Sequence, residues 1–317
     1  MDETLIRRKL KTFVGLRTIK TALAVMVSLI ISYAYDFAYP FFTVIASLIV
    51  MQNSISASYN SGINRMIGTI FGGITGIFFV MLLRSETTYK NIFFIGLGIL
   101  FIVSVMNFFD INKGINISLI VFSAISMSIA ESDVMYYSML RIIDTLIGIL
   151  IALCINIFIF PPNTGKDLLK SYDNLLGEEI KQFTTYVKTG SKISKEKIAD
   201  KLTHTETIFK IYMDDSKLYM GNIIHDTDRK GWRNITRGIQ ALEWVYMHLS
   251  VMEDIGINGN FDETNAEFFY KITGEKMKSD TNSTNSEKDA IYNYHISHIL
   301  KNLDLGINYR KKISYIK

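Results

Sequence analysis

Six long apolar segments in the first half of the chain constrain its fold more than any other sequence feature. They are residues 16–35, 39–59, 66–83, 92–109, 115–130 and 142–160. Most approach the length of about 20 residues that a helix needs to cross the hydrocarbon core of a bilayer. Because backbone polar groups in a bilayer must be satisfied within the segment itself, each segment is predicted to be helical. The first half is therefore predicted to be a six-transmembrane-helix membrane domain.

Charged residues are divided unevenly between the two halves of the chain. Residues 1–160 contain 11 Lys and Arg and 8 Asp and Glu, whereas residues 161–317 contain 23 and 22. A bilayer core excludes charge and a water-exposed surface requires it, so two domains are predicted. The boundary is placed at Pro161-Pro162, which end the last apolar helix. The membrane domain is then residues 1–162 and the second domain is residues 163–317.

The second domain has the pattern of a soluble helical bundle. Apolar residues recur at helical spacing from Leu168 to Val187 and again from Ile235 to Met252. A polar, low-complexity stretch at 279–289 precedes a last helical pattern. About four or five packed helices are expected, and the whole chain is predicted to be all-α.

Basic residues near the N-terminus set the predicted orientation. The residues before the first apolar segment include Arg7, Arg8, Lys9 and Lys11. An excess of Lys and Arg marks the cytoplasmic side of a membrane protein, so the N-terminus is predicted to be cytoplasmic. Six crossings of the plasma membrane return the chain to that side, which makes the second domain cytoplasmic too. The net charge of +4 is small, and nucleic-acid binding is not predicted.

An internal repeat with an offset of 76 residues relates parts of the apolar half. Residues 65–72 (RMIGTIFG) and 141–148 (RIIDTLIG) share the pattern RxIxTxxG, and the same offset pairs Ser47 with Ser123. This predicts two halves of three helices each, and because three is odd the halves would be inverted in the membrane. Inverted repeats of this kind underlie many secondary transporters. The alternative is a chance match, since Arg, Thr and Gly are common where membrane helices start.

Polar residues inside the apolar segments are the candidates for a substrate pathway, because such residues are costly in a bilayer. The candidates are Lys20, Gln52, Asn53, Arg65, Thr69, Arg141, Asp144 and Thr145. Arg65 and Arg141 are predicted to attract anions at the two mouths of the pathway, with Asp144 as a protonatable site. In the structural alternative both arginines reach for lipid headgroups, and Asp144 pairs with Arg141 one helical turn away. Lys20 is predicted to lie too far from Asp144 to pair with it.

Four glycines of one apolar segment follow each other at helical spacing. They are Gly68, Gly72, Gly73 and Gly76. Small residues spaced in this way let a neighbouring helix approach closely. We therefore predict a helix-packing face, with a flexible gate as the alternative.

Several motifs of enzymes and cofactor sites are absent from the sequence. There is no GxxxxGK[ST] loop, HExxH, GxSxG or dinucleotide-binding fingerprint. Cys154 is the single cysteine, which excludes an internal disulfide. All five histidines lie in the second domain, and His295 and His298 share a helix face without an acidic or cysteine partner at ligand spacing. No enzyme activity, cofactor or metal site is predicted.

Several segments of the chain resemble the aromatic acid exporter family, part of the wider fusaric acid resistance-like group. They are GLRTIKTALAV at 15–25, PFFTVIASLIVMQ at 40–52, GINRMIGTIFGGITG at 62–76, RIIDTLIGI at 141–149 and the Pro161-Pro162 pair. The chain looks like the short bacterial form, with one six-helix block and a C-terminal cytoplasmic domain. This resemblance implies export of aromatic or other organic acid anions, driven by an ion gradient. Longer relatives carry two blocks, so it also implies a homodimer.

Two other functions remain open at this stage. The same arginines suit a passive organic-anion channel, and plant malate channels are distantly similar to the family. A membrane-anchored sensor or scaffold would act instead through its soluble domain. The expected partners are membrane lipid, an organic anion substrate and a second copy of the chain.

Overall fold

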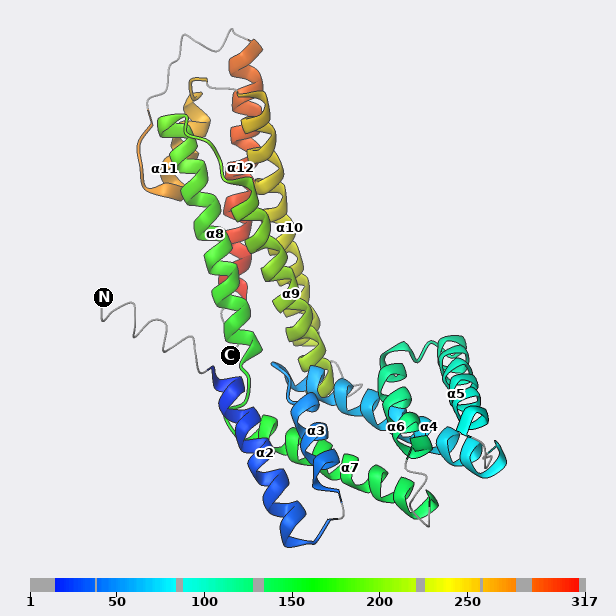
Figure 1. The fold of residues 1–317 in the computed structure, drawn as a ribbon. Helices are drawn as coiled ribbons and strands as arrows, with labels where there is room; N and C mark the ends of the chain where they lie inside the picture. The colour runs from blue at the N-terminus through cyan, green and yellow to red at the C-terminus, as the bar shows by residue number, and fades with distance from the viewer. Residues whose placement is uncertain are drawn as a thin grey trace, which may run out of the picture. The chain divides into compact units, whose positions relative to one another are not determined.

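The computed structural model describes residues 15–37, 39–83, 88–127, 134–220, 226–256, 259–277 and 287–313. Regular structure within these residues consists of helices, which confirms the all-α class for this part of the chain (Figure 1). Contacts divide the chain into two compact units, Met1–Pro162 and Asn163–Lys317. We refer to them as the N-terminal unit and the C-terminal unit.

The N-terminal unit contains six α-helices and one 3-10 turn among its described residues. They are α2 (Leu16–Ala34), α3 (Pro40–Val50), α4 (Ile55–Leu83), α5 (Thr88–Phe108), η1 (Asn112–Gly114), α6 (Ile115–Met127) and α7 (Val134–Phe158). By length and composition α2, α4, α5 and α7 can each cross a bilayer. Helix α3 is apolar but has 11 residues, and the described part of α6 has 13. Six full-length spans were predicted, and four helices here meet that criterion.

The second apolar segment differs from the prediction of one helix over 39–59. Helix α3 ends at Val50, and α4 begins at Ile55, well before the predicted start of the third segment at residue 66. Polar side chains between them bind the backbone: Gln52 donates to the Ile49 carbonyl at 2.8 Å, and the Ala57 amide donates to Ser54 Oγ at 3.1 Å. Side chains that hydrogen-bond to nearby backbone groups favour helix ends over helix interiors. The polar end of this segment therefore breaks the helix.

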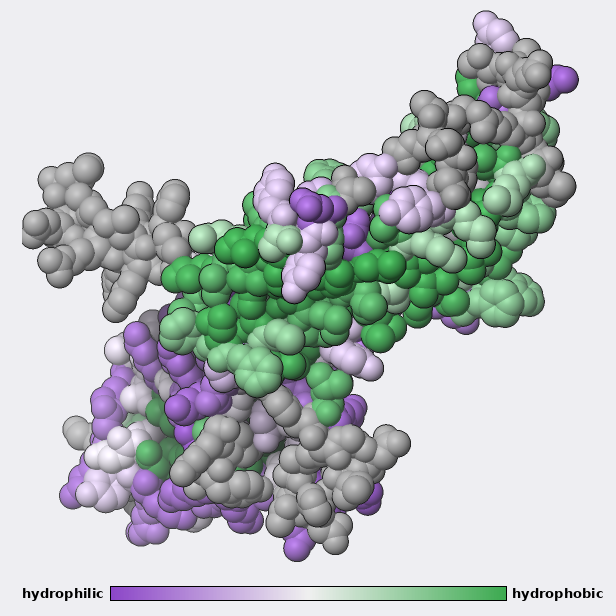
Figure 2. Space-filling view, turned by 90° about the horizontal axis from the view of Figure 1, so that it is seen from below, coloured by the Kyte–Doolittle hydropathy of each residue, from purple (hydrophilic) through white to green (hydrophobic). Residues whose placement is uncertain are grey.

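Two groups of three helices make up the N-terminal unit. Helices α2, α3 and α7 pack around a cluster that includes Ala24, Val50 and Ala152. Helices α4, α5 and α6 pack around Phe79 and Phe122, and α4 also packs against α7. Large apolar side chains cover much of the surface of this unit (Figure 2). Such a surface suits lipid, since the bilayer interior is apolar.

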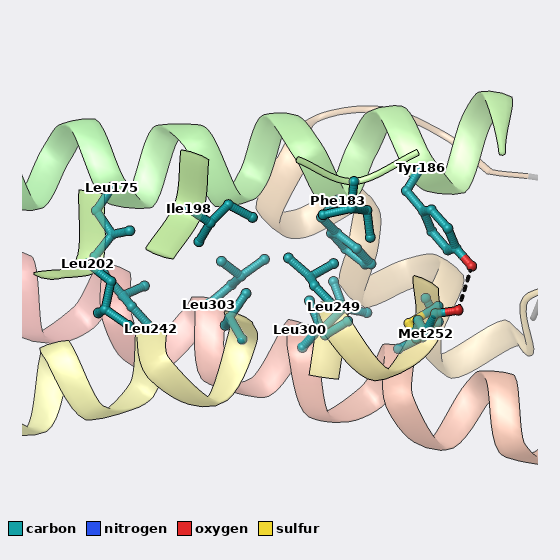
Figure 3. Close-up of a cluster of buried hydrophobic side chains, with 14 of the residues drawn as sticks. Leu175, Phe183, Tyr186, Ile198, Leu202, Leu242, Leu249, Met252, Leu300 and Leu303 are labelled. Carbon is teal, nitrogen blue, oxygen red and sulfur yellow. Dashed lines mark hydrogen bonds between the residues drawn. The ribbon is translucent and has the colours of Figure 1, made fainter. Parts of the chain in front are cut away.

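The C-terminal unit consists of five helices among its described residues. They are α8 (Thr164–Thr189), α9 (Lys195–Met220), α10 (Asp226–Ile255), α11 (Glu263–Thr273) and α12 (Glu287–Lys312). The Asn163 side chain caps α8 by accepting from the Lys166 amide, and Gly190 ends it in the left-handed region at φ 64°. Buried side chains such as Phe183, Leu249 and Leu300 form one continuous core (Figure 3). The surface of this unit is mostly hydrophilic (Figure 2).

Candidate functional site

The N-terminal unit buries polar atoms that have no hydrogen-bond partner among the described residues. They are Ser28 Oγ, Ser32 Oγ, Thr43 Oγ1, Arg65 Nε, Thr69 Oγ1, Ser126 Oγ, Arg141 Nε and Asp144 Oδ2. An unsatisfied buried polar atom costs about 1–3 kcal/mol. Membrane proteins tolerate such atoms where they line a water-filled cavity or a substrate path. The candidate site is therefore sought among these residues and their neighbours.

Arg141 lies in α7 against a group of aromatic rings. Its guanidinium carbon is 3.6 Å from the centre of the Phe42 ring and 5.0 Å from that of Tyr137. The Tyr39 ring packs edge-on against Tyr137, with centroids 5.0 Å apart. Arg141 is 4% exposed, so its charge is held inside the protein by π-faces, which attract cations. We call Tyr39, Phe42, Tyr137 and Arg141 the aromatic arginine cluster.

A second buried arginine, Arg65 of α4, accompanies the aromatic arginine cluster. It is 7% exposed, and it lies close enough to Arg141 for their positive charges to repel one another. The sequence analysis predicted these arginines at the two mouths of a pathway; in the structure α4 packs against α7, and the two positive charges interact. Asp144, one turn along α7 from Arg141, is buried and interacts electrostatically with it. Two like charges held together inside a protein favour an anion between them.

Two threonines occupy matching positions beside the arginines. Thr69 follows Arg65 by one helical turn on α4, and Thr145 follows Arg141 in the same way on α7. Both threonines are buried, at 1% and 3% exposed. A threonine hydroxyl can both donate and accept a hydrogen bond. The Arg–Thr pair thus occurs once on each of the two helices that pack against each other.

A separate polar cluster surrounds Lys20 of α2. The Lys20 ammonium donates to Asn156 Oδ1 at 2.9 Å, and Asn156 Nδ2 donates to Ser58 Oγ at 2.8 Å. The same amide nitrogen lies 3.3 Å from the Gln52 carbonyl and 3.2 Å from the Ser54 carbonyl. Asn156 is 1% exposed and ties the break between α3 and α4 to α7. We call Lys20, Ser54, Ser58 and Asn156 the lysine cluster.

The sequence analysis identified part of the lysine cluster and missed its centre. Lys20 and Gln52 were candidates, and Gln52 contributes its backbone carbonyl to the cluster. Asn53 was a candidate too, but its side chain is exposed. Asn156 was missed, although an asparagine within the last apolar segment is the kind of signal that flags a buried polar contact.

Three of the four candidate packing glycines lie against α6. A Cβ on Gly68 would be 2.7 Å from the Gly114 carbonyl oxygen, one on Gly72 would overlap the Ser118 carbonyl, and one on Gly76 would be 3.0 Å from Ile125. Gly73 differs, because an added Cβ there meets no atom of the chain within 4 Å. Close backbone approach of α4 and α6 thus depends on Gly68, Gly72 and Gly76.

The histidines of the C-terminal unit form a cluster that the sequence only partly indicated. His248 Nδ1 and His295 Nδ1 are 2.9 Å apart, and the His248 ring stacks on His298 with centroids 4.8 Å apart. The sequence had paired His295 with His298 but gave no reason to add His248. No group of three or more His, Cys, Asp or Glu residues within the described ranges is arranged to hold a metal ion.

The fold and the two polar clusters can now be compared with known proteins. Residues 12–159 match the family model described as aromatic acid exporter family member 1. This segment belongs to the aromatic acid exporter family. The match covers nearly all of the N-terminal unit, including both polar clusters. Together with four helices long and apolar enough to cross a bilayer, this match supports a multi-pass membrane protein whose N-terminal unit is similar to a family of exporters.

Curated bacterial proteins are also similar to the chain. UPF0421 protein OB2406 of Oceanobacillus iheyensis is 22% identical over 258 residues, which cover 78% of this chain and 71% of that protein. UPF0421 protein SH1063 of Staphylococcus haemolyticus is 23% identical over 56% of this chain and 51% of that protein. UPF0421 protein SAUSA300_1870 of Staphylococcus aureus is 24% identical over 48% and 44%. The chain thus spans about half the length of the two staphylococcal relatives.

Proposed function

We propose that the protein exports aromatic carboxylate anions across the plasma membrane. The carboxylate binds between the guanidinium groups of Arg65 and Arg141, and the substrate ring packs against the aromatic rings of Tyr39, Phe42 and Tyr137. The observation that carries this proposal is the pair of buried arginines whose Nε atoms have no hydrogen-bond partner among the described residues, one of which, Arg141, packs on those rings. Guanidinium groups bind carboxylates through paired, charge-assisted hydrogen bonds, and edge-on ring contacts add about 0.5–1.5 kcal/mol.

The charges buried in the N-terminal unit support an anionic substrate. Among its described residues the buried ionisable side chains are Lys20, Arg65, Arg141 and Asp144. Three are basic and one is acidic, so the unit holds an excess of positive charge when no ligand is bound. A buried charge without a partner is costly, and a bound carboxylate offsets it.

The packing of the helices supports an inverted repeat around this site. Exchanging α2, α3 and α4 for α5, α6 and α7 maps the α3–α7 contact onto the α6–α4 contact, and the α2–α3 contact onto the α5–α6 contact. The α4–α7 contact maps onto itself. Gly72 packs on the α6 backbone at Ser118, and Gly148, 76 residues later, packs on the α3 backbone at Thr43. Arg65 and Arg141 are equivalent in this exchange, and transporters with inverted repeats bind substrate where the repeats meet.

The remaining expectations complete the proposal. We place both termini in the cytoplasm, because basic residues dominate the N-terminal tail, and we expect two copies of the chain to form a homodimer. Transport proceeds by alternating exposure of the site as the group α2, α3 and α7 moves against the group α4, α5 and α6. Helix groups with separate apolar clusters can move in this way.

The test uses the full chain in proteoliposomes with radiolabelled salicylate and benzoate. Wild-type protein should exchange labelled for unlabelled acid across the membrane. Arg65→Gln and Arg141→Gln should each lower exchange by about 10-fold or more, because each removes one charge-assisted contact. Arg17→Gln is the matched control, since Arg17 is exposed on α2. Equal exchange by wild type and both site variants would overturn the assignment of the site.

A passive anion channel is the second candidate. It is favoured by the buried hydroxyls of Ser28, Ser32 and Thr43, which have no hydrogen-bond partner within the described ranges and suit a continuous water-filled path. Electrical recording from planar bilayers separates the two functions. A channel gives steady anion currents far above the turnover rate of a carrier. A carrier of the proposed kind shows substrate exchange without such currents.

A further inference from the structure

The ammonium group of Lys20 is buried against an uncharged partner. Lys20 is 6% exposed, and the hydrogen bond described for its Nζ goes to the amide oxygen of Asn156. No salt bridge joins Lys20 to an acidic residue within the described ranges. A buried lysine without a countercharge can either recruit an anion or release its proton.

The surroundings of Lys20 resemble the cation sites of transporters with broken helices. In such sites unwound backbone carbonyls and the C-terminal end of a half-helix face the coupling cation. Here α3 stops at Val50, and the carbonyls of Gln52 and Ser54 lie in the break. Both carbonyls accept hydrogen bonds from Asn156 Nδ2, and Asn156 Oδ1 accepts a hydrogen bond from the Lys20 ammonium. The cation at this break is thus supplied by the protein itself.

Charge balance distinguishes Lys20 from the other buried ionisable residues of the N-terminal unit. Asp144 and a bound carboxylate together balance the charges of Arg65 and Arg141, which leaves Lys20 without a countercharge. An arginine stays protonated at any pH that a protein experiences. Asp144 interacts electrostatically with Arg141, one turn away on α7. Lys20 can therefore exchange a proton without changing the charges that surround the bound anion.

We propose that Lys20 carries the proton that couples export to the proton gradient, with Asn156 and the α3–α4 break as its binding site. This inference rests on the proposed function. While the anion is bound, the Lys20 ammonium releases one proton to water and becomes a neutral amine. After the anion leaves, the amine takes one proton from the opposite side. Protons and anions then move in opposite directions.

Protonation of Lys20 also affects how α2 packs against α7 and the α3–α4 break. The charged ammonium forms a charge-assisted hydrogen bond to Asn156, about twice as strong as the bond that a neutral amine makes. Asn156 in turn holds α7 to the break between α3 and α4. Loss of the proton therefore weakens the contact of α2 with both elements. Proton release and helix movement are linked through one amide side chain.

The experiment uses the full chain in proteoliposomes and compares two assays. Exchange of labelled for unlabelled salicylate needs no net proton movement, whereas accumulation driven by an imposed pH gradient does. Lys20→Gln keeps a hydrogen-bond donor for Asn156 Oδ1 but carries no proton, so it matches the neutral amine that accompanies the bound anion. It should keep exchange within about 3-fold of wild type and lose gradient-driven accumulation to the level of empty vesicles. Arg17→Gln, one turn away and exposed, should keep both activities.

A second variant guards against a local packing defect in Lys20→Gln. Lys20→Met is also unbranched and carries no proton. It should give the same split, with exchange retained and accumulation lost. Gradient-driven accumulation at the wild-type level in both variants would overturn the inference, as would accumulation that follows a sodium gradient and ignores pH. A wild-type protein with neither binding nor exchange of any aromatic acid would instead remove the proposed function, and this inference with it.

Discussion

The two units of the protein pair their buried polar groups to different extents, although the C-terminal unit also has a buried group without a partner among the described residues, the carboxylate of Glu179. In the C-terminal unit the Tyr172 hydroxyl donates to the Gly306 carbonyl at 2.9 Å, and Ser171 and Thr205 share a hydrogen bond of 2.9 Å. In the N-terminal unit both buried arginines have an Nε atom without a partner among the described residues. An unpaired buried group costs stability. In the proposed function a bound carboxylate offsets that cost at the two arginines, whereas burial raises the pKa of Glu179 and favours its neutral form.

The apolar cores of the two units differ in their continuity. One continuous cluster runs through the C-terminal unit from Leu168 to Ile313. The N-terminal unit has three small clusters: one between α2, α3 and α7, another between α4, α5 and α6, and a third in which Tyr137 of α7 packs with Val121 and Ile125 of α6. A continuous core resists internal movement, because close-packed side chains have few alternative arrangements. Separate clusters leave the N-terminal unit able to rearrange at the α4–α7 contact.

Substitution of Gly72 tests where the N-terminal unit is rigid and has the largest expected effect. Gly72→Val would drive a side chain into the α6 backbone at Ser118. Overpacking of this kind costs about 1–3 kcal/mol or more, and a backbone carbonyl cannot move aside like a flexible side chain. We expect the variant to lose most of its folded, monodisperse fraction in detergent, as measured by size-exclusion chromatography.

Gly73→Val is the matched control for that variant, since it places the same side chain one residue away. An added Cβ at Gly73 meets no atom of the chain within 4 Å. This variant should keep a wild-type elution profile in the same detergent. Equal loss in both variants would mean that any β-branched residue disrupts α4, and that its contact with α6 is not the rigid element.

Sequence alone predicted the helices well because apolar length and periodicity are local properties. The polar run after Met51 was noticed, but its effect on α3 could not be foreseen. That effect depends on Asn156, which lies about 100 residues further along the chain and binds the Gln52 and Ser54 carbonyls. Contacts across this distance in sequence leave no periodic signal. The same limit applies to Arg65 and Arg141, whose charges act on each other only once α4 packs on α7.

Glu178 tests whether the paired polar groups of the C-terminal unit stabilise it. Its carboxylate is bound by Lys197 and Lys201, each at 2.7 Å. Burial raises the pKa of Glu178, but hydrogen bonds from Lys197, Lys201 and Gln182 outweigh burial and lower it to about 2. The pairing thus contributes stability above the unfolded pKa of 4.5, and this stability is lost as the pH falls towards 2. Glu178→Gln should lower the free energy of unfolding at pH 7 by about 2 kcal/mol.

Tryptophan fluorescence during urea unfolding of the full chain in detergent measures this change. Both tryptophans, Trp232 and Trp244, lie in α10, so the signal reports only the C-terminal unit. Glu196→Gln is the control on the neighbouring helix, since Glu196 is exposed. An unfolding free energy of Glu178→Gln that matches wild type at pH 7 would show that the two lysines add no net stability.

Glu179, the next residue along α8, tests the effect of a buried carboxylate without the lysine partners that Glu178 has. It is fully buried, both carboxylate oxygens lack a hydrogen-bond partner within the described residues, and burial raises its pKa well above 4.5. The folded protein must therefore keep the proton that the unfolded chain releases, which costs stability as the pH rises above 4.5. Glu179→Gln should stabilise the C-terminal unit by about 1 kcal/mol at pH 7 in the same urea assay. Destabilisation by this variant would point to an unrecognised partner for the carboxylate.

The histidine cluster gives the smallest expected effect at pH 7 and the sharpest pH signature. Burial, together with smaller effects of the neighbouring His295 and His298, lowers the pKa of His248 to about 4. In the unfolded chain His248 therefore binds a proton below about pH 6.5, whereas in the folded protein it binds one only near pH 4. Stability is fully present above pH 6.5 and falls by at most about 1.4 kcal/mol per pH unit between these values.

His248→Phe removes this proton while it keeps a ring between Trp244 and His298. The unfolding free energy from tryptophan fluorescence should then change less between pH 6.5 and 5 than in wild type, whereas exposed His204→Gln should retain the wild-type slope. An unchanged slope in His248→Phe would assign the lost stability to other groups. A flatter dependence of the unfolding free energy on pH would show that His248 is uncharged in the folded C-terminal unit. The buried rings of the C-terminal unit stay uncharged and packed, while the buried charges of the N-terminal unit remain available to a ligand.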